Sequence, residues 1–129
     1  MVKIKRVYEA RERGDGERIL VDRLWPRGLS KQAAAVDEWR KDLGPTHELR
    51  KWFGHDPTRW REFRRRYRME LESQHESLTA IARKAREHTV TLLFGARDTE
   101  HNEAVVLKGV IERLGKPTTR AGRRAARAS

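Results

Sequence analysis

The sequence predicts an α/β fold, a single domain in which a small mixed or mostly parallel sheet is flanked by helices. Its 129 residues suit one domain with one modest core. Short apolar runs rich in β-branched residues predict strands, and longer segments with apolar residues every three or four positions predict helices. We expect this domain to cover residues 1–114.

Three segments are predicted to be strands. The first two, 3–10 (KIKRVYEA) and 18–25 (RILVDRLW), are separated by the turn-forming letters RERGDG. Because a parallel crossover normally takes a dozen or more residues, we expect these two to pair as a hairpin unless another strand lies between them. The third segment, 89–96 (TVTLLFGA), is a compact apolar run that predicts a buried strand of a mixed or parallel sheet.

The first predicted helix begins after Ser30, which can cap it, and ends at Gly44 and Pro45. A short helical segment, 47–53, follows. The apolar positions of the first helix recur at helical spacing: Val36, Trp39 and Leu43.

Two further helical regions have clear start signals. Asp56 before Pro57 is a strong N-cap, and Ser73 with Glu76 makes a capping box for a second helix or a continuation of the first. A last helix is predicted over 100–114. The three apolar stripes are Trp60, Phe63, Tyr67 and Leu71; Leu78, Ile81, Ala82 and Ala85; and Ala104, Leu107, Ile111 and Leu114.

The charge of the chain is strongly positive, with a formal net value of +11. Such a charge attracts phosphate-rich partners. Residues 115–129 contain five basic side chains, no acidic one and no large apolar one. This composition predicts a disordered basic tail, which makes nonspecific contacts with anions or has no function.

Several classes of protein are excluded by composition. The absence of cysteine excludes disulfides, thiolate nucleophiles and cysteine-ligated zinc. No apolar run reaches the roughly 18 residues that span a bilayer, and the N-terminus lacks a secretory signal, so we expect a soluble, cytoplasmic protein without membrane contact. The histidines lack the spacing of zinc sites, so no metal is predicted. The sequence does not determine whether a cofactor is needed, nor the oligomeric state.

Polar clusters follow two of the predicted strands. In open α/β sheets ligands bind beyond the carboxyl ends of parallel strands, so the clusters face one another if the strands are parallel neighbours. Tyr8, at the end of the first strand, can join them. The first cluster is Asp22, Arg23, Trp25 and Arg27, and the second is Arg97, Asp98, His101 and Asn102.

These residue types suit a small anionic ligand, either a metabolite or a nucleotide-like group. Arginine forks bind phosphate and carboxylate, and the free N–H groups at a helix start favour an anion. Asp98 and His101 are candidates for an acid/base pair, and Asp22 is a further catalytic candidate. The sequence does not decide whether the protein is an enzyme.

Each candidate also has a structural interpretation. Asp98 or Thr99 can cap the last helix, with Asn102 supplying a reciprocal hydrogen bond. Asp22 and Arg23 can form a buried pair that anchors the turn, Trp25 can belong to the core, and His101 can be a solvated histidine of the first turn. His55 can lean toward the pocket.

An alternative function is a nucleic-acid-binding module. In the segment 59–71 (RWREFRRRYRMEL) six arginines alternate with aromatic residues, a combination that can hold single strands. The aromatic residues share one helical face, however, and such a face normally packs on the core. The arginine face of 59–68 and the basic tail would then contact phosphates. A third hypothesis is an interaction domain without a ligand, which would expose an apolar patch.

Four segments together resemble a known family. In order they are KRVYEA, ILVDRLWPRGLS, ELRKWFGHDPTRWREFRRRY and VTLLFGARDTEHNEAVVL. Over about residues 2–114 they resemble the YeaO-like family of bacterial proteins (domain of unknown function 488). The resemblance implies a small α/β domain and no particular reaction. Arg97 stands where the family usually has Lys, which argues against a mechanism that needs a neutral amine there, while anion binding remains possible.

Overall fold

The computed structural model describes residues 1–115, which form one sheet with helices on both faces. Within this part of the chain the strands are β1 (Val2–Arg6), β2 (Glu17–Leu20), β3 (Glu38–Trp39) and β4 (Val90–Phe94). They are all parallel and lie in the order β1-β4-β2-β3. The predicted α/β class is therefore confirmed. The predicted basic tail lies outside the described residues, apart from Gly115 at the end of the last helix.

The first two strands do not pair as a hairpin, because the stated exception applies: β4 lies between β1 and β2. The connection over residues 7–16 contains only a 3-10 turn, Arg13–Asp15, and side chains of the sheet hold it in place. Lys5 donates to the carbonyl of Ala10 at 2.9 Å, and Thr91 of β4 donates to the carbonyl of Asp15 at 2.6 Å. These bonds let a short connection link two parallel strands.

The predicted helix from Ser30 to Leu43 is wrong beyond its first turn. Ser30 does cap α1 (Lys31–Ala34), but Ala35 adopts a left-handed conformation with φ 49°. The buried guanidinium of Arg18 takes the carbonyls of Ala34 and Ala35, at 2.8 and 3.0 Å, that a continuing helix would use. Residues 38–39 then pair with β2. Tertiary contacts thus override the helical spacing of the apolar residues.

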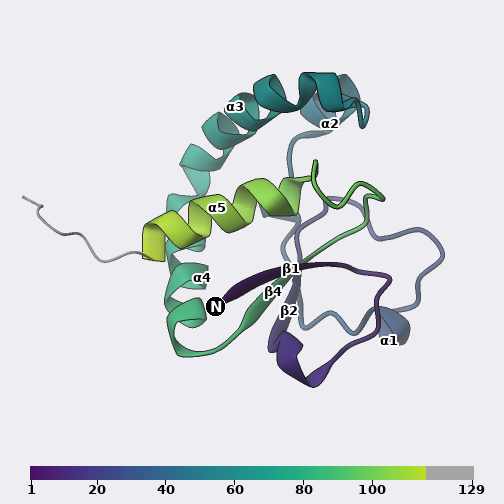
Figure 1. Cartoon of the computed structure of the whole chain (residues 1–129), viewed down its shortest axis with the longest axis vertical. Coiled ribbons are helices and arrows are strands. Elements are labelled where there is room, and N and C mark those ends of the chain that lie inside the picture. The colour runs from purple at the N-terminus through teal and green to yellow at the C-terminus, as the bar shows by residue number, and fades with distance from the viewer. Residues whose placement is uncertain (116–129) are drawn as a thin grey trace, which may run out of the picture.

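The remaining helices are α2 (His47–Phe53), α3 (Trp60–Leu71), α4 (His75–Glu87) and α5 (Glu103–Gly115). Asp56 caps the start of the α3 region, as predicted, by accepting from the backbone of Thr58. The Ser73–Glu76 capping box does not form: Ser73 donates to the carbonyl of Glu70, and α3 continues into α4 through a 3-10 turn. In Figure 1, α2, α3 and α4 follow one another in an arc around α5.

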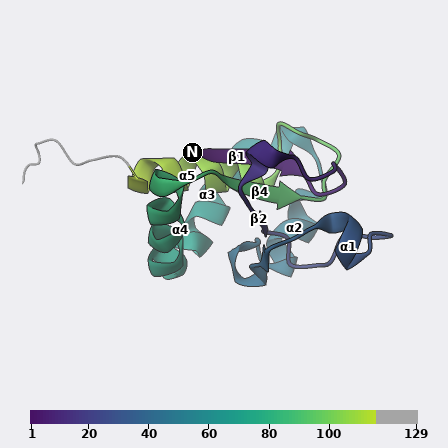
Figure 2. The same cartoon turned by 90° about the horizontal axis from the view of Figure 1, so that it is seen from below.

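The core has two parts, one on each face of the sheet. Figure 2 shows α5 and α1 on opposite sides of the sheet. Because side chains alternate along β4, Leu92 packs among the large helices and Leu93 packs against the α1 side. The larger core contains Phe63, Tyr67 and Leu71 of the predicted stripe on α3, all buried. This packing places the carboxyl ends of β2 and β4 beside α2 and the start of α5.

Candidate functional site

The loops after β2 and β4 meet at the carboxyl edge of the sheet. Asp22 lies just beyond β2, and its Oδ2 accepts a hydrogen bond of 2.9 Å from the backbone N–H of Gly95, just beyond β4. A Cβ at position 95 would lie 3.0 Å from the same oxygen, so the close approach favours glycine. The neighbouring parallel strands thus bring two loops together that are far apart in sequence.

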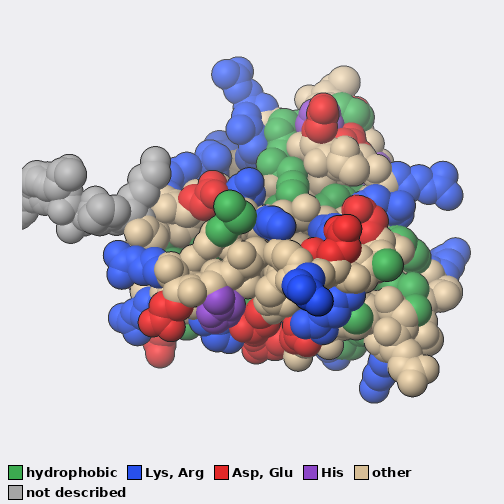
Figure 3. Space-filling view, turned by 60° about the horizontal axis from the view of Figure 1, so that its bottom comes forward, with side chains coloured by type: hydrophobic (Ala, Val, Ile, Leu, Met, Phe, Trp, Pro, Cys, Tyr) green, Lys and Arg blue, Asp and Glu red, His purple; other side chains and the backbone are tan. Residues whose placement is uncertain are grey.

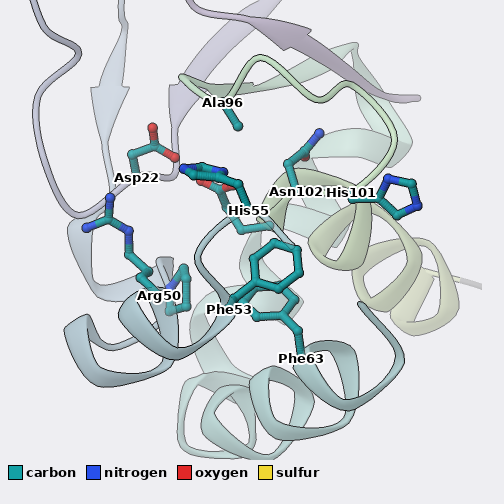
Figure 4. A pocket seen from close by; sticks show the side chains of 10 residues that line it. Asp22, Arg50, Phe53, His55, Phe63, Ala96, His101 and Asn102 are labelled. Carbon is teal, nitrogen blue, oxygen red and sulfur yellow. The ribbon is translucent and has the colours of Figure 1, made fainter. Parts of the chain in front are cut away.

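A cavity of about 90 Å³ opens at this meeting point. It exceeds the roughly 10–15 Å³ that one water needs, but it is well below the roughly 300–1,000 Å³ of pockets that enclose a whole ligand. It can therefore receive one functional group of a larger molecule. Its lining comes from both loops, α2, α3 and the start of α5 (Figure 4): Asp22, Pro45, Arg50, Phe53, His55, Phe63, Ala96, His101, Asn102 and Glu103.

Two carboxyl groups meet in the wall of the cavity. Glu103, the first residue of α5, lines the same cavity as Asp22, near enough for the two carboxyl groups to share a hydrogen bond when one of them is protonated. Burial of its carboxyl group, and then the negative charge of Asp22, raise the pKa of Glu103 well above its ordinary value. The residue as a whole is half-buried, so it is the carboxyl end that is enclosed. The pKa of Tyr67 is also raised, first by burial of its hydroxyl group and then by the negative charges of Glu103 and Asp22.

Arg50 and His55 face this acid pair without hydrogen-bond partners. Within residues 1–115 neither side chain makes a hydrogen bond or an ion pair, although Arg50 is half-buried. In Figure 4 Asp22, Arg50 and His55 point toward the same space. The backbone of His55 has φ 58°, a conformation that costs a non-glycine residue energy. The unpartnered guanidinium is the strongest sign of a ligand in the cavity.

Asp98 and His101 lie within hydrogen-bond distance, 2.9 Å from Oδ2 to Nδ1. The other oxygen of Asp98 accepts from the backbone N–H groups of Glu100 and His101. The bond from Glu100, followed by the His101 imidazole, lowers the pKa of Asp98. In Figure 4 the His101 ring lies beyond Asn102 from Asp22, and its edge meets Trp60, with ring centres 5.2 Å apart. Asp98 thus organises a turn and orients an imidazole at the rim of the cavity.

Asn102 caps α5. Its Oδ1 accepts from the backbone of Val105 at 3.1 Å, while its Nδ2 donates to the carbonyl of Asp98 at 2.9 Å. The helix therefore begins at Glu103 and not at residue 100 as predicted. Because Asn102 and Asp98 occupy several free N–H groups at this end, the helix start offers less to an anion than the sequence indicated.

The other predicted ligand-binding residues do not line the cavity. Arg23 is half-buried and donates from Nε to the carbonyl of Pro45 at 2.7 Å. Trp25 belongs to the smaller core, where its ring meets Trp39 edge to face, with ring centres 5.3 Å apart. The remaining three lie at the surface of the same edge: Tyr8, whose hydroxyl donates to the carbonyl of Arg27, together with Arg27 and Arg97 themselves.

The sequence analysis did not propose five of the lining residues as site residues: Pro45, Arg50, Phe53, Phe63 and Glu103. Phe63 was predicted only as core. Arg50 and Glu103 lie on helices where surface charges are common, so their residue types gave no signal. The position of Glu103 directly after the polar cluster of the second loop was the one clue available.

Other features of the described residues do not compete with this cavity. Within residues 1–115 there is no group of three or more His, Asp or Glu side chains placed to hold a metal ion. In the same range no helix combines the length and the apolar character that a membrane span requires. A wider and more open groove of about 590 Å³ between the N-terminus, α4 and α5 has mostly apolar residues and glycines in its lining, with three charged side chains: Met1, Val2, Ala82, Ala85, Arg86, Gly109, Ile111, Glu112, Arg113 and Gly115.

Comparison with known proteins supports the resemblance noted above. A family model described as "Inactive DUF488-N3 subclade" matches residues 1–127. The chain is 43% identical over 106 residues to the uncharacterized protein YeaO of Escherichia coli K12, covering 82% of this chain and 92% of that protein. It is 39% identical over 106 residues to the uncharacterized protein Rv3073c of Mycobacterium tuberculosis H37Rv, covering 82% and 89%, respectively. No solved structure matches it significantly. The chain therefore belongs to the YeaO-like DUF488 family, in the subclade whose model is described as inactive.

Proposed function

We propose that the protein binds a small anionic ligand, a metabolite or nucleotide-like group, whose anionic end enters the cavity between the two loops. The observation that carries this proposal is Arg50, a half-buried residue that lines the cavity and whose guanidinium has no partner among the described residues. Such an arginine binds a planar or tetrahedral anion well when the anion accepts two of its hydrogen bonds. His55 adds a second donor when its imidazole is suitably protonated.

The size of the cavity decides how much of the ligand enters. At about 90 Å³ it holds a carboxylate or phosphate group but not a nucleoside. The rest of the ligand would lie over the surface of the same edge, where Arg27 and Arg97 are exposed. In this proposal Arg27 and Arg97 contact the outer part of the ligand. Because solvent screens their charges, they contribute less to the binding free energy than Arg50 does.

We propose binding and not catalysis as the main role of the site. The description of the matching subclade as inactive favours this reading. The site nevertheless retains groups suited to proton transfer, namely Asp22 and the Asp98–His101 pair. Within this proposal Asp22 shapes the recognition of the ligand, and Asp98 positions the imidazole of His101.

Replacing Arg50 with Gln tests the proposal. Titration of the full chain with inorganic phosphate, acetate and adenosine monophosphate at constant ionic strength should raise the melting temperature of the unmodified protein. Arg50→Gln should raise the dissociation constant of whichever anion binds by at least about tenfold, because hydrogen bonds to charged groups are stronger than those between neutral groups. The matched control is Arg113→Gln, an exposed arginine near the end of α5, which should change nothing. If no anion shifts the unmodified protein, the proposal fails.

Nucleic-acid binding is the second candidate, and one observation favours it. Arg61, Arg64 and Arg68 follow one side of α3, and within residues 1–115 they form no ion pair. In contrast, Arg65 and Arg66 are held by Glu62, whose pKa they lower to about 2. On the face shown in Figure 3 acidic side chains lie among the basic ones, so that face offers no continuous basic patch.

The aromatic residues of this segment do not support base stacking. Phe63 and Tyr67 are buried, and Trp60 packs against Phe53 and Phe63. What remains is contact with phosphates, which predicts affinity for single-stranded DNA that falls steeply with salt. The triple replacement Arg61→Gln, Arg64→Gln and Arg68→Gln should then reduce the slope of log affinity against log salt concentration by about 2, as measured by fluorescence anisotropy. An unchanged slope in the triple variant would leave the tail as the source of the binding.

A further inference from the structure

The Asp22–Glu103 pair has a geometry that requires a proton. One oxygen of Asp22 is satisfied by the N–H of Gly95, but its Oδ1 is buried and finds no donor among the described residues if Glu103 is ionised. Glu103 lines the same cavity and lies close enough to Asp22 for the two carboxyl groups to interact. Two ionised carboxylates in contact would repel each other in an enclosed site and leave this oxygen unsatisfied. A single proton on Glu103, donated to Asp22 Oδ1, removes both costs.

The charged and titratable groups around the pair come from several elements. Arg50 approaches from α2, His55 from the loop before α3, Tyr67 from α3 and His101 from the turn before α5. Arg50 opposes the rise in the pKa of Glu103, but burial and the charge of Asp22 outweigh it. Arg50 is also not within ion-pair distance of either carboxyl group. The pair therefore carries one negative charge beside one separate positive charge.

This division leaves the cavity with two kinds of hydrogen-bonding group. After Glu103 donates its proton to Asp22, the free oxygen of its carboxyl group can only accept a hydrogen bond. Arg50 can only donate. A simple anion would satisfy Arg50 and leave the acid pair without a donor, and it would be repelled by the charge that the pair carries.

We infer that the Asp22–Glu103 pair selects, among small anions, those that carry a hydroxyl or amino group beside the anionic group. Hydroxy acids and hydroxyalkyl phosphates are ligands of this class. The inference rests on the proposed function, because Arg50 must hold the anionic group while the acid pair accepts from its neighbour. The cavity has room for such a fragment, and the remainder of a longer ligand would extend over the exposed edge.

The experiment compares probes that differ only in the hydroxyl group. Dissociation constants are measured for lactate against propanoate, and for 2-hydroxyethyl phosphate against ethyl phosphate, by NMR titration of the full chain at pH 7 and fixed ionic strength. In at least one pair the hydroxylated member should bind about tenfold more tightly, as expected for a hydrogen bond to a charged group. Equal affinities within both pairs would overturn the inference while leaving anion binding intact. Absence of binding by all four probes would overturn both proposals.

Variants of Glu103 test whether the Asp22–Glu103 pair causes the preference for hydroxylated anions. Glu103→Ala should lose the preference for the hydroxyl group while Arg50 still holds the anion. Glu103→Gln should restore most of it, since the amide donates to Asp22 Oδ1 and still presents a carbonyl oxygen to the ligand. Retention of the full preference by Glu103→Ala would place the hydroxyl contact elsewhere and overturn the inference. Circular dichroism melts confirm that each variant is folded at the titration temperature, and the comparison of probes in the unmodified protein needs no variant.

Discussion

Replacement of Arg18 with Met is expected to lower the free energy of unfolding by about 3–5 kcal/mol. The Arg18 side chain is fully buried and donates to Asp15 at 2.7 Å and to the carbonyls of Ala34 and Ala35. Methionine fills a similar volume but has no donor to offer. Asp15 would then be a buried carboxylate held by Lys5 alone among the basic side chains, and the carbonyls of three residues, Glu9, Ala34 and Ala35, would lose this donor.

The pH dependence provides a second readout for Arg18. Burial by itself would raise the pKa of Asp15, but the N–H of Glu12, then Arg18 and Lys5, outweigh it and lower the pKa to about 2 from an ordinary 3.8. A lowered pKa stabilises the fold above pH 3.8, and this contribution, on the order of 2.5 kcal/mol, is lost as the pH falls toward 2. Arg18→Met should therefore flatten the acid limb of the stability curve.

Urea unfolding of both proteins between pH 2 and pH 7 measures these effects. The matched control is Arg13→Met, an exposed arginine of the same connection, which should cost less than about 0.5 kcal/mol. A loss of under 1 kcal/mol for Arg18→Met would mean that Arg18 does not hold this side of the sheet.

Glu103→Gln is expected to become more stable than the unmodified protein as the pH rises. Burial and the charge of Asp22 raise the pKa of Glu103, so the folded protein keeps a proton that the unfolded chain releases near its ordinary value of 4.5. The stabilisation is thus complete below pH 4.5 and disappears as the pH rises through the folded pKa, at up to about 1.4 kcal/mol for each pH unit. Glutamine keeps the hydrogen bond to Asp22 without a proton to lose.

The two proteins should therefore be similar in stability at pH 4, and the variant should be the more stable one at pH 8. Unfolding in urea across this range gives the two curves. Glu112→Gln, which removes an exposed carboxylate from the same helix, is the control and should run parallel to the unmodified protein. Parallel curves for Glu103→Gln would show that the acid pair does not hold a proton at neutral pH.

Local signals in the sequence predicted the elements whose formation depends on local chemistry. The apolar run of β4 indicated a strand buried on both faces, and the Asp56–Pro57 start and the stripe on α3 lie where the spacing placed them. The helix expected after Ser30 does not continue past Ala34. Arg18 lies on β2, twelve residues before Ser30, and donates to the carbonyls of Ala34 and Ala35 that a longer helix would use. A single-sequence pattern does not contain that contact.

The residues of the candidate site also differ in whether local sequence signals could predict them. Asp22, His101 and Asn102 were accessible to prediction because side chains that follow neighbouring parallel strands meet at one edge. Arg50 was not, because the placement of α2 against that edge depends on packing. Glu103 was not either, since an acidic residue in the first turn of a helix is ordinarily explained by the helix dipole.

The strand order also constrains how the chain acquires its structure. β4, at residues 90–94, fills the space between β1 and β2. During synthesis β1 therefore lacks its partner strand, and β2 can pair only with the two residues of β3, until most of the domain has left the ribosome. Because the central pairings join distant parts of the chain, folding should be slow for a domain of this size. A fragment that stops before residue 90 would be a target for proteases.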